Sequence, residues 1–140
     1  MNTQIEKDFE GCRLTAYPDP GTGGAPFTIG YGHILGVQEG DTCTQDQADE
    51  WLLDDLHDAI ATVQNDVIVP LNDNELSALV DFVFNVGGKN FAGSTLLRLL
   101  NTGQYEQAAA EFGKWNHASG HVLAGLTRRR AAEAALFKTA

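Results

Sequence analysis

Cysteine, methionine and basic residues are scarce in this sequence, and long apolar runs are missing. The 140 residues include two cysteines, one methionine, and nine lysines or arginines against nineteen acids. Two cysteines do not make the disulfide framework of a small secreted scaffold, so we expect Cys12 and Cys43 to be free thiols, with one bridge as the alternative. No apolar stretch approaches the roughly 20 residues that span a bilayer, so we expect no stable membrane insertion.

Metal-ligand spacing and an excess of positive charge are missing too. The histidines and cysteines form no recognisable zinc set, and the residues between His117 and His121 are typical of a loop, so we expect no metal site. The net charge of −10 argues against a nucleic-acid partner, because proteins that bind nucleic acid are usually basic. The acids are concentrated before residue 89, which we interpret as solvated helix faces; a basic C-terminal part facing an anionic partner is the alternative.

The first residues contain acids and no apolar segment typical of a secretory signal. We therefore expect the protein to be made in the cytoplasm without a signal peptide. It then either stays there or is released by another component.

Hydrophobic periodicity and turn residues predict a mainly helical α+β chain. A short helix is expected over residues 3–10, where Ile5 and Phe9 share one face and Gly11 ends the run. Residues 13–35 predict a small antiparallel sheet, because short β-prone runs flank a turn rich in proline and glycine. The helices expected after the sheet cover about residues 44–66, 72–86, 94–101, 105–115 and 127–138, with a loop at 116–125.

The stretch from Glu10 to His33 is the candidate site for chemistry. Glu10 falls in the last turn of the first helix, where the negative end of the helix dipole favours the neutral carboxylic acid. Asp19 lies in a polar turn between prolines, where we expect an ionised carboxylate. Two carboxylates with different surroundings are the minimum for acid and base roles at a glycosidic bond, and the Thr28 hydroxyl would hold a water beside Asp19.

The same stretch resembles the phage-type lysozymes, the endolysins of T-even and lambdoid phages in glycoside hydrolase family 24. In that family eight residues separate a catalytic glutamate from an aspartate, and the same spacing separates Glu10 from Asp19 here. TIGYGH at residues 28–33 is similar to the hairpin signature of that family. Further similar blocks follow in the same order: FNVG at 84–87, STLL at 94–97 and GLTRRRAAE at 125–133. One difference is that eight residues, not five, separate Asp19 from Thr28.

The resemblance implies a single lysozyme-like domain over residues 1–140. A small sheet lobe at about 11–43 would be joined by the helix at about 44–66 to a helical lobe at about 67–140, which also holds the N-terminal helix at 3–10. It further implies hydrolysis of the β-1,4 bond between N-acetylmuramic acid and N-acetylglucosamine in peptidoglycan, without metal or organic cofactor, by a monomer. Catalysis would be inverting, with Glu10 as the acid and with Asp19 and Thr28 placing the water.

Such an enzyme would act on the cell wall, in the periplasm, after release through a separate membrane pore. Two other readings stay open. One is a non-catalytic wall-binding module or a tail-associated lysozyme domain on the same fold; the other is an enzyme acting on a different glucosamine polymer such as chitin.

Five further residues are candidates for supporting roles. Tyr17 and Tyr31 would line a sugar cleft or pack the small lobe. Asn85 matches a family position that contacts substrate, with helix-end hydrogen bonding as the alternative. His33 is expected to be a structural histidine. Arg129 falls on a core-facing helix stripe, where an unpaired charge is costly, so we expect it to pair with an acid of the first helix, Glu10 or Glu6.

Overall fold

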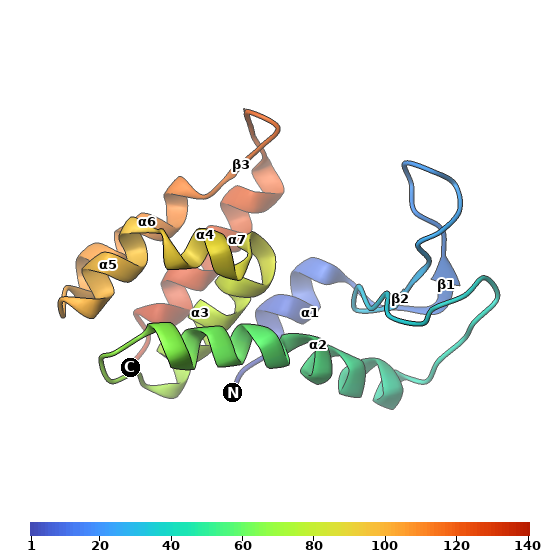
Figure 1. Cartoon of the computed structure of the whole chain (residues 1–140), viewed down its shortest axis with the longest axis horizontal. Coiled ribbons are helices and arrows are strands. Elements are labelled where there is room, and N and C mark those ends of the chain that lie inside the picture. Colours follow the sequence, from blue (N-terminus) through green and yellow to red (C-terminus); the bar gives the residue numbers. More distant parts are fainter. The chain divides into compact units, whose positions relative to one another are not determined.

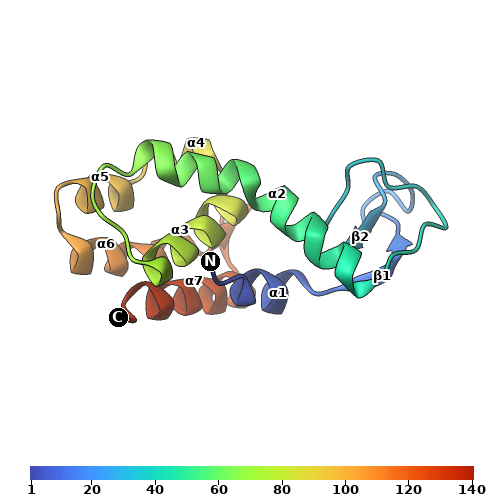
Figure 2. The ribbon, with the colours of Figure 1, turned by 90° about the horizontal axis from the view of Figure 1, so that it is seen from below.

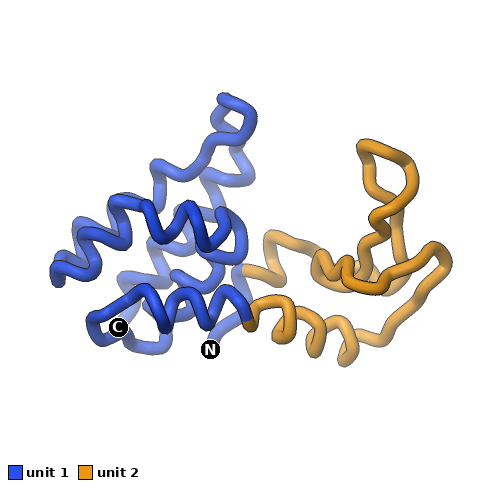
Figure 3. Tube along the Cα trace, in the orientation of Figure 1, with its two compact units in different colours: residues 1–5, 58–140 blue, residues 6–57 orange.

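The structure, a computed structural model, describes all 140 residues and divides into two compact units. Figure 3 shows residues 6–57 as the smaller unit, and residues 1–5 with 58–140 as the larger one. Along the chain, α1 (Gln4–Glu10) and α2 (Gln45–Asp66) each contribute residues to both units. No helix combines the length and apolar character that crossing a membrane requires.

The smaller unit contains an antiparallel hairpin of β1 (Arg13–Tyr17) and β2 (Thr28–Gly30), which confirms the predicted small sheet (Figure 1). Arg13 lies opposite Gly30 and Tyr17 opposite Thr28, with an irregularity between the two pairs. A later segment adds to the β1 edge through a bridge between Thr15 and Thr42. The two ends of β2 are therefore fixed by pairing, although the strand is only three residues long.

The hairpin packs on the first turns of α2 through a glycine. Gly30 has a positive φ of 64°, and a Cβ placed there would lie 3.2 Å from the Ala48 Cβ. Glycine is therefore required twice, for the left-handed backbone and for the close approach of strand to helix. The buried apolar residues of this unit are Ile29, Tyr31, Ala48, Leu52 and Leu56.

The larger unit is helical and is organised around α3 (Asp73–Val86), whose residues 77–83 are all buried. Figure 2 shows α3 and α7 (Ala124–Phe137) side by side, and the two helices are in contact. A capping box begins the helix: the Glu75 amide donates to Asn72 Oδ1, and the Asn72 amide donates to Glu75 Oε1. The remaining elements are α4 (Gly88–Ala92), α5 (Thr95–Asn101), α6 (Tyr105–Glu111), the 3₁₀ turn η1 (Phe112–Lys114), β3 (His117–Ala118) and β4 (His121–Val122).

Phe82 of α3 is the centre of the aromatic core in the larger unit. Its ring meets those of Phe91, Phe112 and Trp115 edge-on, at centroid distances of 6.3, 5.3 and 5.7 Å. Such edge-to-face pairs add to the area buried by each ring. Elements from residues 82 to 115 are therefore held against one side chain of the central helix.

The expected loop at 116–125 is wrong in part, because it contains the β3–β4 hairpin. His117 pairs with Val122 and Ala118 with His121, around a turn in which Ser119 and Gly120 both have positive φ. Two strands of two residues are too short to show a period-2 pattern, so only the Ser-Gly turn could have signalled them. α7 also begins earlier than expected, at Ala124 rather than Thr127.

Candidate active site

Glu10 is the last residue of α1, and its carboxylate lies against the turn that follows β2. A Cβ at Gly32 would lie 3.2 Å from Glu10 Oε1, and Gly32 has a positive φ of 79°. Any larger residue at position 32 would therefore press on the carboxylate as well as strain the backbone. Glu10 is half-buried, so its carboxylate remains in part accessible.

Asp19 is held by its own turn. Its Oδ2 accepts hydrogen bonds from the amides of Gly21 at 3.0 Å and Thr22 at 3.1 Å. Its backbone closes the same turn, because its amide donates to the Gly24 carbonyl and its carbonyl accepts from the Gly23 amide. Both hydrogen bonds to the side chain fall on Oδ2, so Oδ1 is left without a donor from the protein. Asp19 thus has one oxygen fixed in place and one available to a water.

Thr28 begins β2, directly opposite Tyr17, which precedes Asp19 by two residues. The additional residues of the turn fold back on Asp19 rather than lengthening the strands, so the register still brings Thr28 to the base of that turn. Thr28 is half-buried, and its hydroxyl makes no hydrogen bond within the protein. Glu10, Asp19 and Thr28 all belong to the smaller unit.

His33 is buried in the smaller unit, where it contacts a carboxylate, an aromatic ring and a neighbouring backbone segment. Its Nδ1 lies 2.9 Å from Asp55 Oδ2, and its ring stacks on Trp51 at a centroid distance of 4.6 Å. Its backbone forms an antiparallel bridge with Ile29 through two 2.9 Å hydrogen bonds. These contacts fit the expected structural role, since they lock the end of the hairpin to α2.

The two tyrosines differ in how much of their surface is available. Tyr31 is 9% exposed, and its hydroxyl accepts a hydrogen bond from Gln45 Nε2 at 3.0 Å. Tyr17 is half-buried and carries the guanidinium of Arg13 over its ring at 4.4 Å. Packing of the small lobe therefore accounts for Tyr31, whereas Tyr17 keeps surface that a ligand would reach.

Asn85 lies in the larger unit and lines a pocket of about 390 Å³ together with the side chains of Asn90, Trp115, His117 and Arg130, among others. Asn85 makes no hydrogen bond within the protein, while the Val86 carbonyl is taken by Asn90 Nδ2 at 2.7 Å. Helix-end hydrogen bonding, the alternative role, is therefore not what Asn85 does. Its amide faces a polar and aromatic pocket instead.

Arg129 pairs with a residue that the sequence did not single out. Its Nε donates to Asp81 Oδ2 at 3.0 Å, and its second nitrogen donates to Asp81 Oδ1 at 2.7 Å. Both residues are buried, and they come from α7 and α3. The pairing of Arg129 with Glu10 or Glu6 stays a prediction. The available signal for Asp81 was a lone charge in the mainly apolar stretch 76–86.

Arg130 and Glu133 extend this buried charged cluster. Arg130 Nε lies 2.6 Å from Glu133 Oε1, its second nitrogen donates to Glu133 Oε2 at 2.7 Å, and its guanidinium covers the Phe82 ring at 5.2 Å. Burial, followed by the adjacent Asp81 carboxylate, raises the pKa of Glu133, although Arg130 acts in the opposite direction. We call Asp81, Arg129, Arg130 and Glu133 the buried charged cluster.

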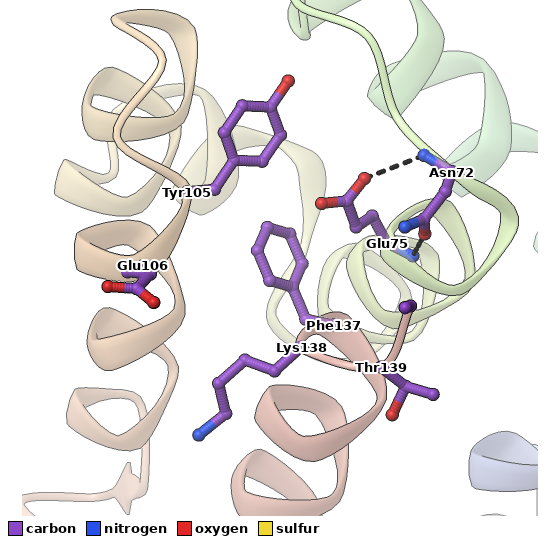
Figure 4. Close-up of a pocket in the computed structure, with 8 residues that line it drawn as sticks. Asn72, Glu75, Tyr105, Glu106, Phe137, Lys138 and Thr139 are labelled. Atoms are coloured by element: carbon purple, nitrogen blue, oxygen red, sulfur yellow. Dashed lines mark hydrogen bonds between the residues drawn. The ribbon is translucent and has the colours of Figure 1, made fainter.

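A second pocket, of about 260 Å³, lies where the ends of α3, α6 and α7 meet in the larger unit (Figure 4). It is lined by Tyr105, Phe137 and Glu75, among others. Glu75 is engaged in the capping box. Tyr105 donates its hydroxyl to the Pro70 carbonyl at 2.6 Å. None of the residues expected to act in chemistry lies in this pocket. No group of three or more His, Cys, Asp or Glu side chains is arranged to hold a metal ion.

Comparison with known proteins gives one consistent family. The family model described as phage lysozyme matches residues 7–133. The endolysin of Acyrthosiphon pisum secondary endosymbiont phage 1 is 41% identical over 138 residues, which cover 96% of this chain and 92% of that protein.

Solved structures give the same answer for the fold. The muramidase domain of SpmX from Asticaccaulis excentricus superposes with a TM-score of 0.89 at 39% identity, covering 99% of this chain and 95% of that one. A variant of P22 lysozyme superposes with a TM-score of 0.87 at 38% identity, covering 97% and 94%. The lysozyme-like α+β fold expected from the sequence is confirmed.

Proposed function

The chain belongs to the phage lysozyme family, and from this premise we propose that it is an endolysin whose Glu10 and Asp19 catalyse hydrolysis of the peptidoglycan glycan strand. Membership of the family makes it a glycoside hydrolase of the bacterial cell wall. The single observation that carries the residue assignment is the state of Asp19. One carboxylate oxygen is fixed by two backbone amides, and the other is open to a water.

The bond cleaved is the β-1,4 bond between N-acetylmuramic acid and N-acetylglucosamine. Glu10 donates a proton to the glycosidic oxygen as it leaves. Its position over Gly32 supports this role, because the close contact restricts where the carboxylate lies. Asp19 then removes a proton from the attacking water through Oδ1, and the Thr28 hydroxyl orients that water.

This sequence of events inverts the configuration at the anomeric carbon. In inverting glycosidases the base activates a water rather than attacking the sugar itself, and the two carboxyl groups leave room for that water. The free hydroxyl of Thr28 at the base of the Asp19 turn supports water rather than a covalent intermediate. The first product formed would therefore be the α-anomer, which proton NMR of a fresh digest distinguishes from the β-anomer.

Asn85 and Tyr17 contribute to binding of the substrate. Asn85 has an uncommitted amide in a pocket with Trp115, a combination suited to a polar group with an apolar face. Tyr17 offers a half-buried ring of the kind on which a sugar packs. The enzyme acts as a monomer on the cell wall.

The assignment is tested with Glu10→Gln in a clearing assay on outer-membrane-permeabilised Gram-negative cells. Loss of the proton donor is expected to slow clearing by about 10²–10⁴-fold, the usual contribution of general acid catalysis. Glu39→Gln is the matched control, because Glu39 is an exposed acid of the same unit and the chemical change is identical. Wild-type clearing by Glu10→Gln would contradict the assignment.

A product analysis separates the alternative functions. Reducing ends at muramic acid in the digest identify a muramidase, whereas a wall-binding module would sediment with the wall and release no reducing ends. An enzyme directed at chitin would cleave chitin oligomers faster than peptidoglycan. The wild-type protein and Glu10→Gln are compared in all three measurements.

A further inference from the structure

The turn at residues 20–25 holds Asp19 through Thr22, an exposed residue whose backbone amide contacts the candidate base and whose side chain bonds the rest of the turn. The Thr22 amide donates to Asp19 Oδ2 at 3.1 Å. The Thr22 hydroxyl donates to the Ala25 carbonyl at 3.1 Å and accepts from the Gly24 amide at 3.2 Å. Gly24 in turn accepts from the Asp19 amide at 2.9 Å. Thr22 therefore links both sides of the turn to the carboxylate.

We propose that Thr22 is a positioning residue for hydrolysis: its hydroxyl braces the turn so that two amides fix Oδ2 of Asp19 and direct Oδ1 at the attacking water. This inference rests on the proposed role of Asp19 as the base. It gives a purpose to the turn between Asp19 and Thr28, since that turn contains the hydroxyl and both of the amides that hold the carboxylate.

The amides act by geometry as well as by charge. Two N–H groups on one oxygen restrict rotation of the carboxylate about its χ2 torsion, which is otherwise broad and two-fold. A base that is kept in one orientation holds the attacking water in the productive position for more of the time, so hydrolysis is faster.

Gly21 provides a second, independent sign of the same close fit. A Cβ at position 21 would lie 3.1 Å from Asp19 Oδ2, which is tighter than nearly all real contacts of a Cβ atom. Gly21→Ala would therefore push the carboxylate while leaving every hydrogen-bonding group of the turn present. Thr22→Ala removes the hydroxyl that holds the turn, and Gly21→Ala displaces the Asp19 carboxylate that the turn positions. Both changes are therefore expected to impair the attack of water.

Steady-state kinetics on soluble glycan fragments test the proposal with Thr22→Ala, Thr22→Ser and Gly21→Ala. We expect kcat to fall about ten- to a hundredfold in Thr22→Ala and Gly21→Ala with KM within about twofold of wild type, because positioning of the water changes and glycan contacts do not. Thr22→Ser keeps the hydroxyl and should recover kcat to within about threefold. Wild-type kcat in Thr22→Ala, or equal loss in Thr22→Ser, would overturn the proposal.

Thr102 supplies a matched control. It is also an exposed threonine in a turn whose hydroxyl makes two hydrogen bonds, donating to the Leu99 carbonyl and accepting from Gln104 Nε2, both at 2.8 Å. Thr102→Ala is expected to leave kcat unchanged. If it lowered kcat as much as Thr22→Ala, the effect would be a general loss of turn stability, and the proposal would be wrong.

Amide hydrogen exchange measured by NMR separates this inference from the proposed function. Exchange at Gly21 and at position 22 should accelerate in both Thr22→Ala and Asp19→Ala, since the first change loosens the turn that carries the two amides and the second removes the oxygen that accepts from them. Wild-type activity in Asp19→Asn would overturn the proposed function. Wild-type activity or unchanged exchange in Thr22→Ala, beside an inactive Asp19→Asn, would overturn this inference alone.

Discussion

Asp19 and Asp81 are both hydrogen-bonded carboxylates, yet the two are held in opposite ways. Both bonds to the side chain of Asp19 come from amides of one turn and fall on Oδ2. At Asp81 the guanidinium of Arg129 donates to each of the two oxygens. Asp19 is partly exposed, whereas Asp81 is fully buried.

The difference separates a carboxylate suited to reaction from one suited to structure. A fork of two donors on two oxygens, closed off from water, leaves no lone pair directed at a substrate. Two donors on a single oxygen orient the group and leave the other oxygen to accept a proton. Burial and the presence of a charged partner therefore do not by themselves mark an active site in this chain, even though they mark its most unusual side chains.

The largest effect expected from this comparison is on stability and concerns the buried charged cluster. Arg129→Ala would leave Asp81 buried without the guanidinium, which costs about 3–5 kcal/mol of the free energy of unfolding. Urea denaturation measures this loss. Arg128→Ala is the control, since the neighbouring arginine is exposed and its removal should stay within about 0.5 kcal/mol. A similar small change in Arg129→Ala would show that the cluster is not a structural unit.

The next effect is on rate and concerns the hairpin. Thr28→Val keeps the shape and the β-branched form of the side chain but removes the hydroxyl that we propose orients the water. We expect kcat to fall about ten- to a hundredfold, the equivalent of one hydrogen bond to a charged or reacting group, with unfolding little changed. Thr28→Ser should retain most of the activity. If Thr28→Val lowered stability and left kcat intact, the hairpin would resemble the buried cluster rather than differ from it.

The hairpin side of this comparison was largely predictable from the sequence, because it depends on residues that are close together along the chain. The spacing of Glu10 and Asp19 and the turn between the strands both lie within 24 residues, and each was predicted from propensity and motif. Family resemblance supplied the substrate and the bond, which no local pattern contains.

The partners that sequence reasoning missed are set by tertiary packing. Asp81 and Arg129 are 48 residues apart, and they meet only because α3 and α7 pack together. Helix periodicity placed Arg129 on the core-facing stripe but could not say which acid would face it. Thr22 was missed for another reason: its role comes from a closed set of turn hydrogen bonds, and the composition of the turn indicates only that a turn exists.

The last effect expected is a change in how stability depends on pH, and it concerns Glu133. Burial and the neighbouring Asp81 raise the pKa of Glu133 to about 10 in the folded state, from the usual value of 4.5, with Arg130 opposing them. The folded protein then binds this proton more tightly than the unfolded chain, so the contribution of Glu133 to stability is full below pH 4.5 and is lost as pH rises toward 10. Glu133→Gln, which does not titrate, should flatten this decline in urea-unfolding series between those limits, while Glu106→Gln on the exposed surface of α6 should reproduce the wild-type slope. An unchanged slope in Glu133→Gln would mean that Arg130 keeps Glu133 ionised. The buried charged cluster would then consist of two complete ion pairs, in sharper contrast with Asp19, where only one carboxylate oxygen is hydrogen-bonded.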